Sequence, residues 1–389
     1  MGSAMSLKFI FAVLLVSIFI SGCGGGGGAS NAVANLTNTA QLSETAVVTT
    51  FDLTTVTEVD LTEQNFVAYV AQAPQAWQDV VGPINNARAT LGRVLFYDPR
   101  LSSNNEVSCA TCHAQEAAFS DPRSNNTTSQ GVNGRTAKNS PQLTNVALHP
   151  GGRMFWDERA EHLVDQADDP IQDANEMNET FPALLVELAD VIYYEQLFIN
   201  AFENTPGNNI TQIRLQEAIA EFEKTLLSFN SPFDNNNLNQ QAQNGLNEFN
   251  ANNNECSNCH GQAETGATFN MVVDAGIAAG GGIGAFPQGI DIGLNQDDID
   301  TTSFKTMSLR NVEVSAPFTH LGQLATLNDL MDFYADAPGT GPIDRPTTDP
   351  RVQNIGLNNQ DRQEIIAFLE SLTDQSFLTN PLFSNPFNN

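Results

Sequence analysis

The chain is poor in basic residues. Its 389 residues include 16 Lys and Arg against 45 Asp and Glu, which gives a formal net charge of −29. Nucleic-acid binding depends on clustered Lys and Arg that neutralise phosphates, so we expect no nucleic-acid partner. An acidic surface can instead attract a basic protein partner, although an acidic surface that serves only solvation explains the same composition equally well.

Long hydrophobic runs are also missing. The apolar run Phe9 to Ile20 is too short to span a bilayer comfortably. It follows Lys8 and precedes Ser21-Gly22-Cys23, as in an export signal. Ile20 to Cys23 resembles a bacterial lipobox, in which Cys23 becomes the lipidated first residue of the mature chain. A plain cleaved signal or an uncleaved anchor is the alternative.

The residue after Cys23 bears on the destination. Gly24 is not the Asp that usually retains such lipoproteins at the inner membrane. We therefore expect a periplasmic protein, lipid-anchored to the outer membrane. Each of these interpretations of the signal exports the protein.

Cysteine is scarce as well, with five in the chain. Four of them form two C-x-x-C-H runs, Cys109-Ala110-Thr111-Cys112-His113 and Cys256-Ser257-Asn258-Cys259-His260. This is the signature of c-type haem attachment, in which two thiols join the haem vinyl groups and the His binds the iron. A redox pair or a four-sulfur zinc site needs no His after the second Cys, and zinc pairs usually lie far closer in sequence. The sequence therefore predicts two covalent haems.

Composition and periodicity predict the organisation of the chain. Residues 1–23 form the signal with its lipobox, and residues 24–65, which begin with polyglycine, form a flexible tether. The spacing of the haem motifs suits two domains, 66–235 and 236–389, separated after Ser231-Pro232 and an Asn run. We expect a mainly α fold of two c-type cytochrome domains, each with one covalent haem.

Apolar residues at helical spacing locate the helices. A polar loop at about 121–140 could sit over a haem face, the glycine-rich stretch 276–293 predicts another loop, and the tail after Asp374 looks extended. The expected helices are Phe181–Glu203, Ile210–Phe229, one from about Gln240, Thr326–Ala335 and Asp361–Leu372.

Around both haem motifs the chain resembles bacterial di-haem cytochrome c peroxidases. The stretches similar to their first domain are Leu91–His113, Lys138–Pro141, Phe155–Arg159, Gln166, Pro170–Gln172 and Glu176–Met177. Those similar to the second domain are the second haem motif, Leu309–Val312, Ala316–His320 and Thr326–Leu327. The resemblance covers about residues 80–373 in the family's order.

The resemblance implies roles for single residues. His113 would bind the iron at which H2O2 reacts, and Glu176 on the distal side would move the proton that O–O cleavage requires. Gln166 and Pro170 would line the same pocket. Trp156 would lie between the haems as an electron relay. A surface position for Glu176 and a plain core position for Trp156 are the alternatives that residue type alone suggests.

The resemblance also implies one Ca2+ between the domains. Asn139, Ser315 and Pro317 match the positions that hold it, and oxygen ligands suit this cation. Family members more often have Thr where this chain has Ser315. A small c-type cytochrome or another redox protein would donate electrons, and a homodimer is a reasonable expectation.

Two departures from the best-known peroxidases affect the expected chemistry. Those enzymes carry a His in the loop after the first motif that closes the iron until reduction, whereas residues 114–148 contain no His here. The first haem is therefore predicted to be five-coordinate or water-bound, unless His149 closes it. At the second haem, Tyr334 stands where they have Met, as in MauG, the methylamine-utilisation enzyme that oxidises a partner protein. Met331, one turn away, and Met307 are alternative ligands.

Three functions follow from these residues. The first is an exported di-haem peroxidase that reduces H2O2 at the His113 haem with electrons passed through the His260 haem. The second is a MauG-like oxidase that modifies Trp or Tyr of a partner protein, which Tyr334 and the missing loop His favour. The third is a di-haem electron carrier, in which Glu176 would have no task over an open iron.

Overall fold

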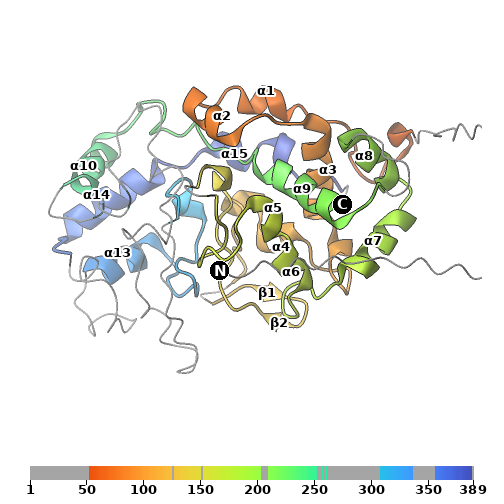
Figure 1. Cartoon of the computed structure of the whole chain (residues 1–389). Coiled ribbons are helices and arrows are strands. Elements are labelled where there is room, and N and C mark those ends of the chain that lie inside the picture. The colour runs from red at the N-terminus through yellow and green to blue at the C-terminus, as the bar shows by residue number, and fades with distance from the viewer. Residues whose placement is uncertain are drawn as a thin grey trace, which may run out of the picture. The chain divides into compact units, whose positions relative to one another are not determined.

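The computed structural model describes residues 52–124, 127–149, 152–202, 209–251, 256, 260, 307–335 and 355–387. Helices dominate them (Figure 1), which confirms the mainly α fold. Cys23, the expected tether up to residue 51 and the expected loop 276–293 lie outside the described residues. Across the described segments, no helix combines the length and apolar character that crossing a bilayer requires.

The described helices are mostly short. They are α1 (Phe66–Val70), α2 (Gln75–Val81), α3 (Asn86–Tyr97), α4 (Cys109–Cys112), α5 (Leu163–Gln166), α6 (Asp168–Gln172), α7 (Phe181–Asp190), α8 (Tyr194–Ala201), α9 (Gln212–Glu223), α10 (Gln240–Phe249), α13 (Leu327–Ala335), α14 (Asn359–Glu370) and α15 (Gln375–Leu378). Strands β1 (Gln130–Gly131) and β2 (Gly134–Arg135) pair antiparallel, with Gln130 opposite Arg135.

Helices α3 and α9 cross closely, next to the first haem motif. Asn85 caps α3 by accepting a hydrogen bond from Arg88 N (2.9 Å). At the crossing, a Cβ on Gly92 would lie 1.9 Å from the carbonyl oxygen of Ala218. Only glycine permits this approach, so the backbone of α3 rests directly on α9.

Two predicted helices are shorter than expected because tertiary contacts end them. The stretch Phe181–Glu203 is split into α7 and α8, because two tyrosines at the break bond to another part of the chain. The Tyr193 hydroxyl accepts a hydrogen bond from Arg100 (3.1 Å). The Tyr194 hydroxyl donates one to Asp98. Helix α9 ends at Glu223 instead of Phe229. Beyond it, Asn145 N donates to Leu226 O (2.8 Å) and Asn145 Oδ1 accepts from Ser228 N (2.9 Å).

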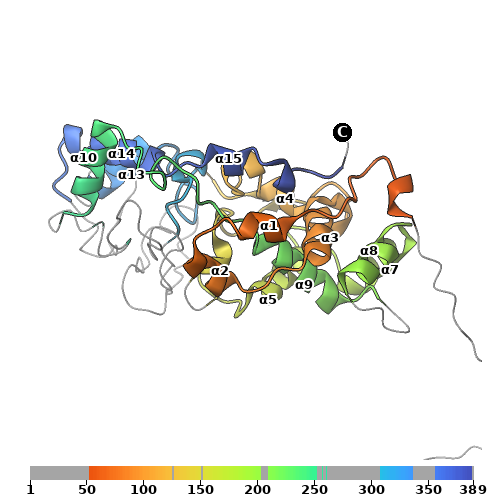
Figure 2. The ribbon, with the colours of Figure 1, turned by 90° about the horizontal axis from the view of Figure 1, so that it is seen from above.

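Helices α10, α13 and α14 form a second group, apart from α3 and α9 in both views (Figures 1 and 2). The Cβ that Gly245 of α10 lacks would lie 1.8 Å from Glu364 O of α14. Thr326 caps α13, because Asp329 N donates to its hydroxyl (3.1 Å) while the Asp329 carboxylate accepts from Thr326 N (2.9 Å). Helix α14 begins at Asn359, two residues before the predicted start.

The C-terminal segment packs into the core beside the first helical group, so the expectation of an extended tail is wrong. Phe377, Leu378 and Phe383 are buried in one apolar cluster with residues of α1, α3 and α9. Arg93 donates to Ser384 O (2.8 Å) and Tyr97 to Phe383 O (2.7 Å). The division into haem domains at residue 235 stays a prediction.

Candidate active site

The first haem motif opens onto a large cavity. Cys109, Cys112 and His113 line a space of about 890 Å³. Much of the polar loop after the motif also lines it, including Thr128 and Arg135. This volume falls in the upper part of the range of cofactor pockets, about 300–1,000 Å³.

His113 is oriented as an iron ligand. Its Nδ1 lies 2.7 Å from the carbonyl oxygen of Phe119, which can only accept, so Nδ1 carries the proton and Nε2 keeps a free lone pair. Burial lowers the pKa of His113, so the imidazole is neutral at pH 7. A fixed, neutral imidazole directly after two cysteines of a C-x-x-C-H run fits a c-type haem.

The cysteines do not resemble a zinc or redox site. Burial raises the pKa of Cys112 to about 12, and burial together with the nearby Glu223 carboxylate raises the pKa of Cys109. Neither thiol is poised as a thiolate. Cys256 does not line this cavity, and Cys259 lies outside the described residues. The described residues therefore assemble no shared site for four sulfurs.

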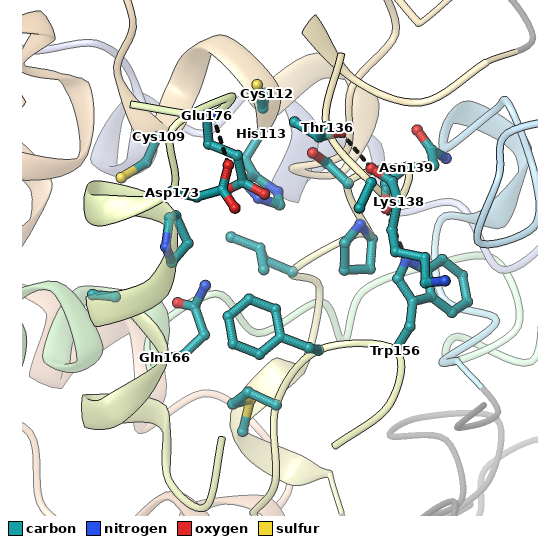
Figure 3. Close-up of a pocket in the computed structure, with 18 of the residues that line it drawn as sticks. Cys109, Cys112, His113, Thr136, Lys138, Asn139, Trp156, Gln166, Asp173 and Glu176 are labelled. Carbon is teal, nitrogen blue, oxygen red and sulfur yellow. Dashed lines mark hydrogen bonds between the residues drawn. The ribbon is translucent and has the colours of Figure 1, made fainter. Parts of the chain in front are cut away.

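Three residues singled out by the sequence meet in this cavity. Gln166 ends α5, Pro170 lies in α6 and Glu176 lies in the turn that follows, and all three line the cavity with His113 (Figure 3). Glu176 N donates to the Asp173 carboxylate (3.2 Å), which fixes the turn. Burial, and then the Asp173 charge, raise the pKa of Glu176 to about 7, against an opposing effect of Arg159. A carboxyl with this pKa can both accept and return a proton near neutral pH.

A second, smaller cavity of about 150 Å³ contains the other predicted ligands. His260 and Tyr334 both line it. Met331 packs in the adjoining core and is not part of the lining, whereas Met307 lines both cavities. Burial lowers the pKa of His260 to about 4, so this imidazole is also neutral and able to bind iron.

Trp156 lies where the two cavities adjoin. The residues that line both are Asn139, Ser140, Pro141, Gln142, Trp156 and Met307. The Trp156 indole N–H donates to Asn139 O (2.8 Å), and its ring stands 6.2 Å from the His320 ring. An oxidisable side chain thus lines both cavities.

The three expected calcium ligands come together beside the second cavity. Asn139, Ser315 and Pro317 all line it, and Asn139 Nδ2 donates to Pro317 O (2.9 Å). Asn139 Oδ1 is buried and has no hydrogen-bond partner among the described residues. A buried oxygen without a donor fits a hard cation such as Ca2+.

Sequence reasoning missed a buried carboxyl in the first cavity. Glu223 is 4% exposed, and its Oε2 finds no partner in the described part of the chain. Burial raises its pKa to about 8. Its position four residues after Ile219, on the cavity side of α9, is a helical spacing that could have placed it in the cavity.

His149, the alternative ligand of the first haem, does not line the cavity. Its Nε2 lies 2.9 Å from Glu158 Oε1, and both side chains are buried. No sequence pattern indicated this pair, because neither residue belongs to a regular helix.

The chain is similar to proteins named as di-haem peroxidases and as MauG or MauG-like proteins. The family model for di-haem cytochrome c peroxidase matches residues 86–243. The methylamine utilization protein MauG of Methylophilus methylotrophus is 31% identical over 302 residues, which cover 75% of this chain and 83% of that protein. The cytochrome c551 peroxidase of Nitrosomonas europaea is 31% identical over 326 residues, which cover 79% and 86%. A crystal structure of a MauG-like protein associated with microbial copper homeostasis aligns with a TM-score of 0.65 at 27% identity, over 79% of this chain and 95% of that one.

Proposed function

The chain belongs to the di-haem cytochrome c peroxidase family and is an oxidoreductase of the haem peroxidase type, and from that premise we propose that it is an exported peroxidase that reduces H2O2 at the His113 haem. Electrons reach that haem through the haem of His260. Membership of the family implies haem c as the cofactor. The observation that carries the proposal is the meeting of Glu176, Gln166 and Pro170 with His113 in one cavity.

The protein side chains have distinct tasks in this reaction. When bound, the haem iron supplies the redox chemistry by which H2O2, two electrons and two protons become two water molecules. Glu176 takes the proton from one peroxide oxygen and returns it to the departing oxygen, which a pKa of about 7 allows. Gln166, in the same cavity, can hydrogen-bond the peroxide and orient it. Pro170 adds no backbone N–H donor to the pocket.

We propose that the first iron stays open without prior reduction. His113 is the one histidine among the described residues that line the first cavity, and His149 is engaged with Glu158. No described His side chain is thus poised to close the iron. Trp156, which lines both cavities, relays the electrons between them.

A second candidate, the MauG-like oxidation of Trp or Tyr on a partner protein, is favoured by Tyr334. This residue lines the second cavity with His260, whereas Met331 does not. A phenolate ligand is a hard anionic donor, so it lowers the haem potential and suits oxidation of a demanding substrate. In that case a protein substrate takes the place of the electron donor.

The remaining features of the proposal concern the protein's surroundings. Asn139, Ser315 and Pro317 hold one Ca2+, and the orphaned Asn139 Oδ1 supports this. We propose a periplasmic location through a lipid on Cys23, at the outer membrane. The electron donor is a small c-type cytochrome or another redox protein, and the protein forms a homodimer.

The test is an EPR spectrum of the as-isolated ferric holoprotein, with H2O2 turnover measured before and after one-electron reduction. We expect one high-spin and one low-spin haem, and turnover without reduction. Two low-spin haems with turnover only after reduction would keep the peroxidase but contradict the open iron. Two low-spin haems with no turnover in either state would make the protein an electron carrier.

A further inference from the structure

A buried pair links the turn that carries Trp156 to the rest of the chain: Glu158 of this turn and His149. Nε2 of His149 stands 2.9 Å from Oε1 of Glu158, with side-chain exposures of 2% and 7%. Neither residue lines either cavity. The pair therefore takes no part in the chemistry described above, yet two buried polar groups are joined there by a well-formed hydrogen bond.

The turn has a backbone that must be held in place. Met154 N donates to Ala160 O (3.0 Å), which closes residues 154–160 into a narrow loop. Within it, Phe155 and Glu158 have φ values of +70° and +57°, which side-chain-bearing residues rarely adopt. Such conformations persist only where the surroundings determine them. His149 is hydrogen-bonded to Glu158, the second of these two residues.

Trp156 belongs to the same loop and is also held through its side chain. Its indole N–H donates to Asn139 O (2.8 Å), so the ring is held at one end by Asn139 while its backbone is held near Glu158. A small rotation of the loop would move the indole relative to both cavities. Functional groups that must be placed to within about 0.5 Å depend on such supporting contacts.

We propose that His149 and Glu158 are positioning residues that set the place of Trp156 between the two haem cavities and thereby the rate of electron transfer between the haems. The inference rests on the proposed function, in which Trp156 is the relay. No bond forms or breaks at the pair. The pair acts only through the loop.

The test compares Glu158→Leu with Glu158→Gln in the holoprotein. Gln keeps an oxygen that accepts from His149, whereas Leu removes it at similar size. After rapid one-electron reduction, we expect inter-haem transfer to slow at least tenfold in Glu158→Leu and to stay within about twofold of the wild type in Glu158→Gln. The EPR signals of both ferric haems should be unchanged in each variant.

A second readout reports on the position of Trp156 without electron transfer. The ultraviolet resonance Raman band of the indole N–H responds to its hydrogen bond with Asn139 O. Because Trp77 is the one other Trp in the chain, the variants are prepared in a Trp77→Phe background. We expect the band to shift in Glu158→Leu and not in Glu158→Gln. If Glu158→Leu does not fold, His149→Gln and His149→Leu form the equivalent comparison, since Gln can donate to Glu158.

Trp156→Phe distinguishes the role of Trp156 as relay from the role of His149 and Glu158 in positioning it. If it slows transfer while Glu158→Leu changes neither rate nor Raman band, the positioning inference is overturned and the relay stands. If Trp156→Phe leaves the rate unchanged, the relay is wrong and the inference falls with it. If Glu158→Leu and Glu158→Gln slow transfer equally, the hydrogen bond is not the cause, which also contradicts the inference.

Discussion

Glu176 is the side chain on which the peroxidase proposal depends most. It lies in a turn fixed by Asp173, in the cavity of His113, with its pKa raised to about 7 by burial. Glu176→Gln keeps the size of the side chain but cannot accept a proton. We expect both haems to remain attached while peroxide turnover falls by about 10² to 10⁴, the usual contribution of a positioned acid–base group. Unchanged turnover would remove Glu176 from the mechanism.

The same residue predicts a pH dependence. The carboxylate is the form that accepts a proton from H2O2, and its population grows as pH rises through about 7. The rate of the peroxide reaction should therefore rise between about pH 6 and pH 8, and Glu176→Gln should flatten the profile. Glu161→Gln, which alters an exposed carboxyl outside the cavity, is the control and should keep the wild-type profile.

Glu223 predicts that the free energy of unfolding decreases as pH rises. Its folded-state pKa of about 8 lies above the ordinary 4.5, so the folded protein holds the proton more tightly than the unfolded chain. The resulting stability is complete below about pH 4.5 and is lost as pH rises through about 8. Between pH 6 and pH 9 the wild type should lose about 3 kcal/mol relative to Glu223→Gln. Denaturant unfolding of the holoproteins measures this difference, and parallel curves would refute it.

Tyr334 can be tested as a ligand by spectroscopy. It lines the second cavity with His260, whereas Met331 lies in the core. Tyr334→Phe should alter the absorption and EPR spectra of one haem and leave the other unchanged, because the phenol oxygen is lost. Met331→Leu should leave both spectra as they are. The reverse result would transfer the ligand role to Met331.

At the scale of elements, two glycines determine how closely helices can cross. Gly92 brings α3 onto Ala218 of α9, and Gly245 brings α10 onto Glu364 of α14. Both helices precede a haem motif in sequence, α3 the first motif and α10 the second. The crossing of α3 with α9 therefore helps to position the first motif at its cavity.

Gly92→Ala tests the first crossing. Its Cβ would meet the Ala218 carbonyl at 1.9 Å, so the helices must separate. We expect a loss of about 3 kcal/mol in the free energy of unfolding, at the upper end of overpacking effects. Gly356→Ala is the matched control, because no described atom lies within 4 Å of its Cβ. Equal stability of the two variants would show that the crossing adapts.

At the scale of the whole molecule, the last residues of the chain complete the core around the first haem motif. Gln115 donates to Phe377 O (3.2 Å) and Asn380 O (2.9 Å), and Phe119 packs against the Phe377 ring. Phe119 O is also the partner of His113 Nδ1. The orientation of His113 thus depends on a segment more than 250 residues away in sequence.

Phe377→Ala tests this dependence. The side chain is fully buried, so its truncation should cost about 3–5 kcal/mol of stability. We expect the first haem's absorption spectrum to change at lower denaturant concentration than in the wild type. Gln375→Ala, in the same short helix but exposed, should behave as the wild type. A normal midpoint in Phe377→Ala would show that the C-terminal segment is dispensable.

Local patterns in the chain were enough to predict the two haem motifs and several of the helices. Each haem motif needs only five consecutive residues, because both thiols and the iron ligand come from one turn of chain. Helical spacing likewise located α10, α13 and α14 to within a few residues, since an apolar face repeats regularly along the chain. The mainly α fold agreed with expectation. The placement of Gln166, Pro170 and Glu176 in one cavity with His113 also agreed, but that expectation came from the family resemblance and not from a local pattern.

Other features had no local pattern to reveal them. The break between α7 and α8 follows from the contacts of Tyr193 and Tyr194 with Arg100 and Asp98, and α9 ends where the chain bonds to Asn145. The burial of Glu223, the pair of His149 with Glu158 and the return of Phe377 likewise arise from distant parts of the chain. Residue types and spacings specify the ligands and the helices, whereas packing between segments far apart in sequence decides which polar groups are buried and how the cavities adjoin at Trp156.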